Sequence, residues 1–78
     1  MNRQELIDRV VVDPKICGGQ PVIRGTRIMI AMILDGIADG MTAEQIIDYH
    51  PHLTVDDVRG AVAYASQLTR NPSLKTAV

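Results

Sequence analysis

The chain has no tryptophan and no phenylalanine, and tyrosine occurs only twice. Proteins that hold single-stranded nucleic acids commonly stack the bases on aromatic side chains. So few aromatic residues argue against a stacking platform of that kind. There is also only one cysteine, Cys17, which excludes an internal disulfide and is typical of a protein that works in a reducing compartment. We therefore expect a cytoplasmic protein.

Long apolar runs are also absent. No stretch approaches the roughly 20 consecutive apolar residues that a bilayer-spanning helix requires. The chain begins Met-Asn-Arg-Gln-Glu and lacks the apolar segment of a signal peptide. We therefore expect neither export nor a membrane span, and no membrane as a partner.

The size of the chain limits its architecture. At 78 residues it is long enough for one domain and too short for two. A composition of 46% hydrophobic and 22% charged residues is typical of a folded domain. Because a chain of this length hides only roughly 60% of its unfolded surface, an isolated monomer is expected to be marginally stable. We therefore predict a homodimer or a larger assembly.

The formal net charge of −1 conceals an uneven distribution. Residues 1–34 carry five basic side chains against three acidic ones, whereas residues 35–67 carry one basic side chain against six acidic ones. Arg70 and Lys75 add positive charge at the end of the chain. Acidic side chains repel phosphates, so any contact with nucleic acid is expected from the two ends of the chain.

The N-terminal third predicts a small β-ribbon over about residues 9–28. Val10-Val11-Val12 is β-branched, and an extended chain resumes at Pro21-Val22-Ile23 after the pair Gly18-Gly19. Glycines and prolines in this stretch are expected to set the backbone geometry of the ribbon.

A tight turn is predicted at the end of the ribbon. Gly25 occupies the position that a type II turn reserves for a positive φ, so Thr26-Arg27-Ile28 can run back beside Val22-Ile23. At the other end of the ribbon, Asn2 and Glu5 can cap a short turn that precedes it.

Three helices are predicted after the ribbon, at about residues 29–39, 43–49 and 55–69. Apolar residues recur at helical spacing in the first and the third of them. The expected buried stripes consist of Ile30, Ile33, Leu34 and Ile37 in the first helix, and of Val55, Val58, Ala61, Val62, Ala65 and Leu68 in the third.

The helix ends carry their own signals. Gly40 suits the left-handed residue that ends a helix, and Thr42 and Thr54 are expected N-caps of the second and third helices. Pro51 ends the second helix. The pattern stops after Arg70, which predicts one domain over residues 1–70 and a frayed tail over 71–78.

The stretch from Gly40 to Ile47, followed by Leu53 to Val58, is typical of a helix-turn-helix. The fold class is therefore predicted as mainly α, a tri-helical, homeodomain-like bundle with a small N-terminal β-ribbon. A DNA-reading helix usually carries hydrogen-bond donors in its first turns, whereas here Asp56 and Asp57 would face the phosphates. This favours a structural role for the third helix over base reading.

The segment from Cys17 to Arg27 fits neither a phosphate-binding Walker loop nor a dinucleotide fingerprint, because its glycines have the wrong spacing. Its arginines either lie on the surface of the ribbon or grip phosphates or acidic side chains of a partner. The candidate partner or nucleic-acid contacts are Arg24, Arg27, Lys15 and Thr26. The candidate structural residues are Gly19, Pro21, Gly25, Gly40, Thr42 and Thr54.

No catalytic, cofactor or metal site is predicted. His50 and His52 flank Pro51 in a turn without further ligands nearby in sequence, which favours a surface turn over a metal site. Cys17 has no assignable base, and the adjacent Asp56 and Asp57 are interpreted as helix-capping residues. We therefore expect a protein that is not an enzyme.

The chain resembles the small prokaryotic "domain of unknown function 433" family over about residues 7–68. The resemblance is carried by residues 13–28, 34–40, 53–58 and 61–64, and its most specific part is Gly19-Gln20-Pro21-Val22-Ile23-Arg24-Gly25-Thr26-Arg27. It implies a tri-helical, helix-turn-helix-like domain with an N-terminal β-ribbon. It also implies a frequent role as the antitoxin beside a ribonuclease-like toxin of the PIN-like type. Met29 departs from relatives that often carry proline there, which affects only the start of the first helix.

Two functional hypotheses follow. The first is a non-catalytic, antitoxin-like protein that binds a toxin protein, because the acidic middle of the chain would attract a basic, RNA-cleaving partner. The alternative is a dimeric helix-turn-helix repressor that binds double-stranded DNA without a toxin partner. The two roles can coexist in one protein.

Overall fold

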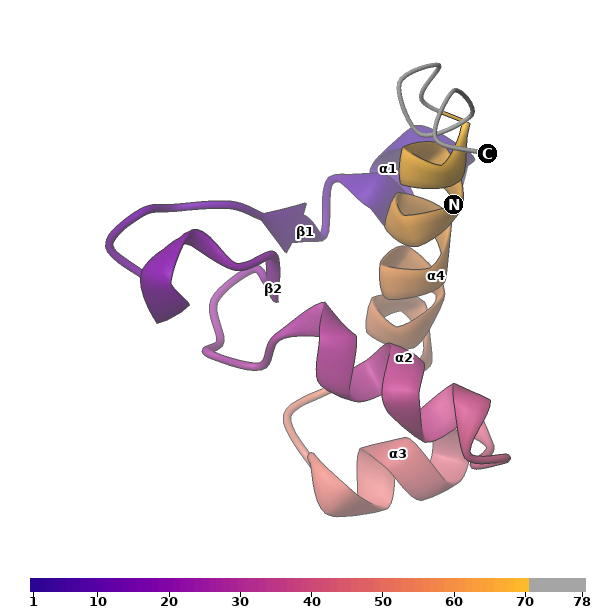
Figure 1. The fold of residues 1–78 in the computed structure, drawn as a ribbon. Helices are drawn as coiled ribbons and strands as arrows, with labels where there is room; N and C mark the ends of the chain where they lie inside the picture. Colours follow the sequence, from indigo (N-terminus) through magenta and orange to yellow (C-terminus); the bar gives the residue numbers. More distant parts are fainter. Residues whose placement is uncertain (71–78) are drawn as a thin grey trace.

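The computed structural model describes residues 1–70, so the tail predicted at 71–78 lies outside the described residues. Figure 1 shows a mainly helical chain with a small antiparallel sheet projecting to one side. Its elements are α1 (Arg3–Ile7), β1 (Val10–Val11), the 3-10 turn η1 (Cys17–Gly19), β2 (Val22–Ile23), α2 (Ile30–Ala38), α3 (Ala43–Tyr49) and α4 (Val55–Thr69). The predicted fold class, mainly α with a small N-terminal ribbon, is confirmed.

The ribbon is shorter than the predicted span of about 9–28. Only two residues of each strand pair, with Val10 opposite Ile23 and Val11 opposite Val22, and an isolated bridge joins Val22 to Met29. The residues between the strands form a loop that contains η1. The backbone of Cys17 has a positive φ of 50° there, and Gly19 one of 85°, which bends the chain back toward β2.

The turn after β2 has the geometry that its glycine predicts. The amide of Thr26 donates to the carbonyl of Ile23 over 3.0 Å, and Gly25 has a φ of 78°. The amide of Ile23 in turn donates to the carbonyl of Ile28 over 3.0 Å. The chain therefore returns beside β2 as expected.

The helix ends carry the expected caps. Thr42 forms a capping box with Gln45, and Thr54 forms one with Asp57. Gly40 has a φ of 90° just after α2. Helices α3 and α4 begin and end at the residues expected from the sequence, and α2 is one residue shorter at each end.

Helix α1 is the main addition to the predicted tri-helical bundle. Asn2 and Glu5 do form a capping box, but the turn they open continues into a helix of five residues. Figure 1 shows α1 beside the C-terminal part of α4, with α2 and α3 at the N-terminal end of α4. A helix this short has too few residues for an apolar repeat to reveal it.

The buried face of α4 differs from the predicted stripe. Val58 and Ala61 are buried, and the face continues through Asp57, Gly60 and Ala63. Val55, Val62 and Leu68, which the repeat placed in the core, are each 45% exposed. The core itself lies between the ribbon and the three longer helices, and it is built from Val10, Ile23, Ile30, Ile33, Ile46, Leu53, Val58 and Ala61.

A close contact between backbones explains why α4 is turned in this way. A Cβ atom at Gly60 would lie 2.6 Å from the carbonyl oxygen of Leu6. Glycine therefore allows α1 to approach α4 closely, and Leu6 is 7% exposed in this contact. Because α1 covers the side of α4 that carries Gly60 and Ala63, the side with Val55 and Val62 is left at the surface.

Candidate functional site

The turn after β2 and the connection between α3 and α4 enclose a surface hollow of about 600 Å³, called here the basic hollow. Two arginines and one histidine contribute to its lining. The full set is Arg24, Gly25, Thr26, Arg27, Ile28 and His52. The fold thus places His52 beside a turn that lies more than twenty residues away in the sequence.

The guanidinium group of Arg24 is held in place by the backbone of the segment after α1. Its Nε and Nη2 atoms both donate to the carbonyl oxygen of Asp8, over 3.2 and 2.6 Å. The amide of Arg24 also donates to the carbonyl of Arg9 over 2.7 Å. Arg24 therefore has a structural role in addition to carrying charge at the rim of the hollow.

The other candidate contact residues differ in whether their side chains are free to bind a ligand. Arg27 is exposed, and within residues 1–70 its guanidinium donates no hydrogen bond. The hydroxyl of Thr26 donates to the carbonyl of Ile23 over 2.8 Å and accepts from the amide of Ile28 over 3.0 Å, so it stabilises the turn. Lys15 is exposed but lies outside the basic hollow. The structure thus brings Arg24, Thr26 and Arg27 to one hollow, whereas Lys15 is not among the residues that line it.

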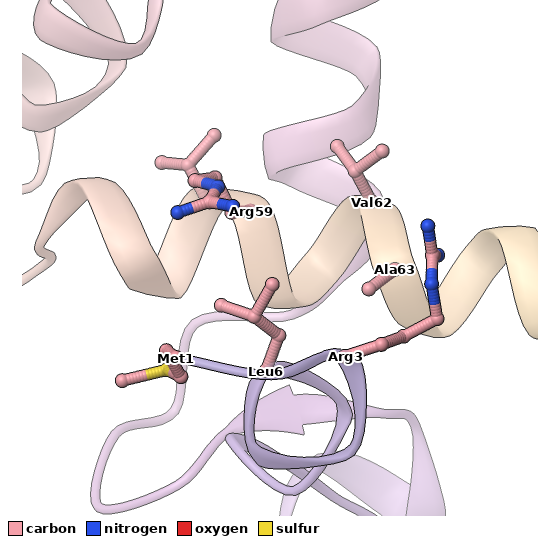
Figure 2. Close-up of a pocket in the computed structure, with 7 residues that line it drawn as sticks. Met1, Arg3, Leu6, Arg59, Val62 and Ala63 are labelled. Carbon is pink, nitrogen blue, oxygen red and sulfur yellow. The ribbon is translucent and has the colours of Figure 1, made fainter.

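A second hollow, of about 370 Å³, lies between α1 and α4. Figure 2 shows Leu6 pointing from α1 toward α4, with Met1 on one side of it and Arg3 on the other. We call this surface the α1–α4 groove, and its lining consists of Met1, Arg3, Leu6, Val58, Arg59, Val62 and Ala63. Met1 is 57% exposed and Val62 is 45% exposed, so much of the apolar lining is open to water.

A third hollow, of about 270 Å³, lies against α2 and α3. Its lining combines two carboxylates with methionines and an exposed tyrosine, and consists of Met32, Asp35, Gly36, Asp39, Met41, Ile46, Tyr49 and His50. His50 therefore faces a different hollow from His52. Within residues 1–70, no three histidine, cysteine or acidic side chains gather in a way that could hold a metal ion.

The two carboxylates at the start of α4 do not both face outward, which corrects the expectation from the sequence. Asp57 is 8% exposed, and its Oδ1 atom lies 2.9 Å from Nη1 of Arg9. Asp56 is more exposed, and its Oδ1 atom lies 3.5 Å from Nη1 of Arg59. Asp57 is thus neutralised inside the fold, and only Asp56 presents a carboxylate to the surroundings.

Comparison with known proteins places the fold in a family. Residues 10–65 match the family described as "Protein of unknown function (DUF433)". The chain belongs to this family. The resemblance seen in the sequence is therefore confirmed.

Two relatives illustrate the similarity of this DUF433 protein to others. It is 36% identical over 56 residues to "Uncharacterized protein y4eO" of Sinorhizobium fredii (strain NBRC 101917 / NGR234), a match that covers 72% of this chain and 25% of that protein. The chain thus matches about a quarter of the length of this curated relative. It is also similar to the crystal structure of a DUF433 member protein from Anabaena variabilis ATCC 29413. That similarity has a TM-score of 0.72 and 31% identity, and covers 90% of this chain and 66% of that chain.

The basic hollow and the α1–α4 groove differ in how much of their lining falls within the residues that match the DUF433 family. The basic hollow lies wholly inside the matched residues, whereas α1 and Arg9 precede them. Three of the seven residues that line the α1–α4 groove, Met1, Arg3 and Leu6, therefore lie outside the family match. None of the helices within residues 1–70 combines the length and apolar character that a bilayer crossing needs.

Proposed function

We propose that this DUF433 protein is a non-catalytic, antitoxin-like component of a toxin–antitoxin pair that binds a ribonuclease-like, PIN-like partner protein. The observation that carries the assembly in this proposal is the α1–α4 groove, whose exposed apolar side chains form a surface for a second copy of the chain. Val62 and Met1 line it, and Val55 extends the same exposed side of α4 by two turns. In the proposal this groove joins two copies of the chain, and the assembled dimer presents its charged faces to the toxin.

The third hollow, which lies against α2 and α3, supports the proposal of a basic partner because its lining is acidic. Asp35 and Asp39 lie beside Tyr49, which is 76% exposed. A carboxylate pair next to an open aromatic ring attracts lysine and arginine side chains by charge and by cation–π contact. A toxin that binds RNA carries such basic side chains.

The candidate nucleophiles and acids support a binding role over catalysis. The Sγ atom of Cys17 has the carbonyl of Arg27 as its hydrogen-bond partner, at 3.5 Å. The carboxylate of Asp57 holds Arg9 and the amide of Thr54. These groups serve the fold, and the proposal assigns no reaction to them.

Self-association is tested by light scattering after size exclusion at micromolar concentration. We expect a dimer for the wild type and a monomer for Val62→Lys, because the charge would be buried in the groove. Val12→Lys is the matched control: Val12 is 54% exposed but lies on the loop after β1, so this variant should remain dimeric. A wild-type protein that runs as a single 8.5 kDa species contradicts the dimer.

The partner is tested by co-expression with the reading frame adjacent to the gene, which the proposal expects to encode a small nuclease-like protein. The proposal expects that frame to arrest growth alone and this protein to restore it through a complex. An adjacent frame that encodes no such protein, or growth arrest that this protein does not relieve, contradicts the antitoxin role.

A second candidate function is a dimeric helix-turn-helix repressor without a toxin partner. The neutralisation of Asp57 by Arg9 favours it, because this removes part of the expected repulsion of DNA at the start of α4. Binding to its own promoter in the absence of any partner protein would separate this candidate from the first.

A further inference from the structure

We infer that the basic hollow is a phosphate-binding site that takes the backbone of duplex DNA, with His52 as a contact residue alongside Arg27 and Arg24. The inference rests on the DNA-binding part of the proposed function and deepens it. It places the DNA contact at the turn after β2 and at the connection between α3 and α4. In this inference α4 does not read bases.

The lining of the basic hollow has the chemistry that phosphate recognition requires. Arginine side chains and backbone amides are frequent phosphate contacts in protein–DNA complexes. Arg24, Arg27 and His52 supply donors, and the hollow has no acidic side chain in its lining. Within residues 1–70 the amides of Gly25 and Arg27 also donate to no protein acceptor, so they remain available to an anion.

The turn is shaped for a close approach of the ligand. Gly25 has a φ of 78°, and a Cβ atom placed there would meet nothing within 4 Å, so open space lies over its backbone. The two hydrogen bonds from Arg24 to the Asp8 carbonyl fix that guanidinium before any ligand arrives. A side chain that is already oriented loses less conformational entropy on binding. Nη1 of Arg24 remains outside this interaction.

Two observations favour duplex DNA over a single strand. Neither tyrosine of the chain lines the hollow, so no aromatic ring is present there to stack an unpaired base. His52 lies two residues before Thr54, the N-cap of α4. A phosphate held by His52 would therefore lie beside the start of α4, close to the duplex backbone that a helix-turn-helix straddles.

The experiment is a fluorescence anisotropy titration of the full chain with a labelled duplex of about two helical turns, repeated over a series of salt concentrations. We expect Arg27→Ala to flatten the slope of log affinity against log salt by about 0.9, the value for one phosphate contact. We expect His52→Ala to weaken binding by about tenfold at low salt. Arg59→Ala removes the same charge from a side chain that is already paired with Asp56 in the acidic middle of the chain, and it should leave the slope unchanged.

Arg24→Ala is a poorer probe, because it also releases the Asp8 carbonyl. Circular dichroism melts of each variant verify that it folds. The inference is overturned if the wild type binds no duplex at low salt, if a single-stranded RNA binds more tightly than the duplex, or if Arg59→Ala abolishes binding while Arg27→Ala has no effect. Light scattering and the toxin co-expression measure the proposed protein–protein function separately. That function would therefore stand even if one of these results overturned the DNA site.

Discussion

Arg9 and Asp57, which are 48 residues apart in the sequence, form an ion pair in which Nη1 of Arg9 lies 2.9 Å from Oδ1 of Asp57. The second carboxylate oxygen of Asp57 accepts from the amide of Thr54 over 2.9 Å, and the amide of Asp57 donates to the Thr54 hydroxyl over 3.2 Å. One side chain therefore closes the N-terminal cap of α4 and ties α4 to the segment that follows α1.

We expect Asp57→Ala to lower the free energy of unfolding by about 2 kcal/mol, because it removes a cap and leaves the Arg9 guanidinium without its partner. Urea denaturation followed by circular dichroism measures the change. Asp56→Ala is the matched control. Its carboxylate forms only an exposed pair with Arg59, so the loss should stay below about 1 kcal/mol. Equal losses for the two variants would show that the Arg9–Asp57 pair contributes nothing beyond surface charge.

Gly60 and Gly36 are both helical glycines, but their substitution by alanine should have opposite results. At Gly60 the new Cβ would lie 2.6 Å from the Leu6 carbonyl oxygen, so α1 must move away. We expect Gly60→Ala to lower the free energy of unfolding by about 1–3 kcal/mol, although alanine has a better helix propensity than glycine.

At Gly36 the nearest atom to the new Cβ is Cγ1 of Ile46 at 3.3 Å, a side-chain atom that would have to move by only a few tenths of an ångström. Gly36→Ala should be neutral or should raise the melting temperature, because alanine favours the helix by up to about 1 kcal/mol. Thermal melts of the two variants check the prediction. A Gly60→Ala protein as stable as Gly36→Ala would mean that the α1–α4 contact is readily rearranged.

Gly40 ends α2 with a φ of 90° and has open space around its Cβ position. Gly40→Val should lower the free energy of unfolding by at least about 1 kcal/mol. The backbone conformation alone causes this loss, since the new Cβ atom would contact no neighbour. Gly40→Asn should cost less, because asparagine tolerates left-handed geometry better than a β-branched residue does. An unchanged melting temperature for the valine variant would show that the glycine is merely tolerated there.

Asp56→Ala should strengthen binding to duplex DNA at low salt. It removes the more exposed carboxylate at the start of α4 and frees Arg59 from its pair. Asp57→Asn should change DNA affinity much less, since this side chain is buried against Arg9. The anisotropy titration described above compares the two. Weaker binding by Asp56→Ala would mean that this carboxylate contacts a base directly and that α4 reads sequence.

The sequence by itself determined the features that depend on neighbouring residues. The threonines at 42 and 54 cap their helices through residues three positions ahead, and Gly25 and Gly40 take the positive φ that their turns need. These are local interactions, so the helix bounds at α3 and α4 and the turn after β2 follow from short stretches of chain. The apolar repeat similarly identified Ile30 and Ile33 as buried, but it was wrong for Ile37, which is 38% exposed.

Only the tertiary structure decided which side of α4 is buried and which charges remain available. The repeat in α4 has apolar residues around much of the helix, and the contact of α1 at Gly60 selects the buried side and leaves Val62 exposed. The pairing of Arg9 with Asp57 and the placing of His52 beside Arg27 join residues far apart in the chain. Periodicity and capping report only on residues within a few positions of each other, so contacts of this kind have no local signal to predict them.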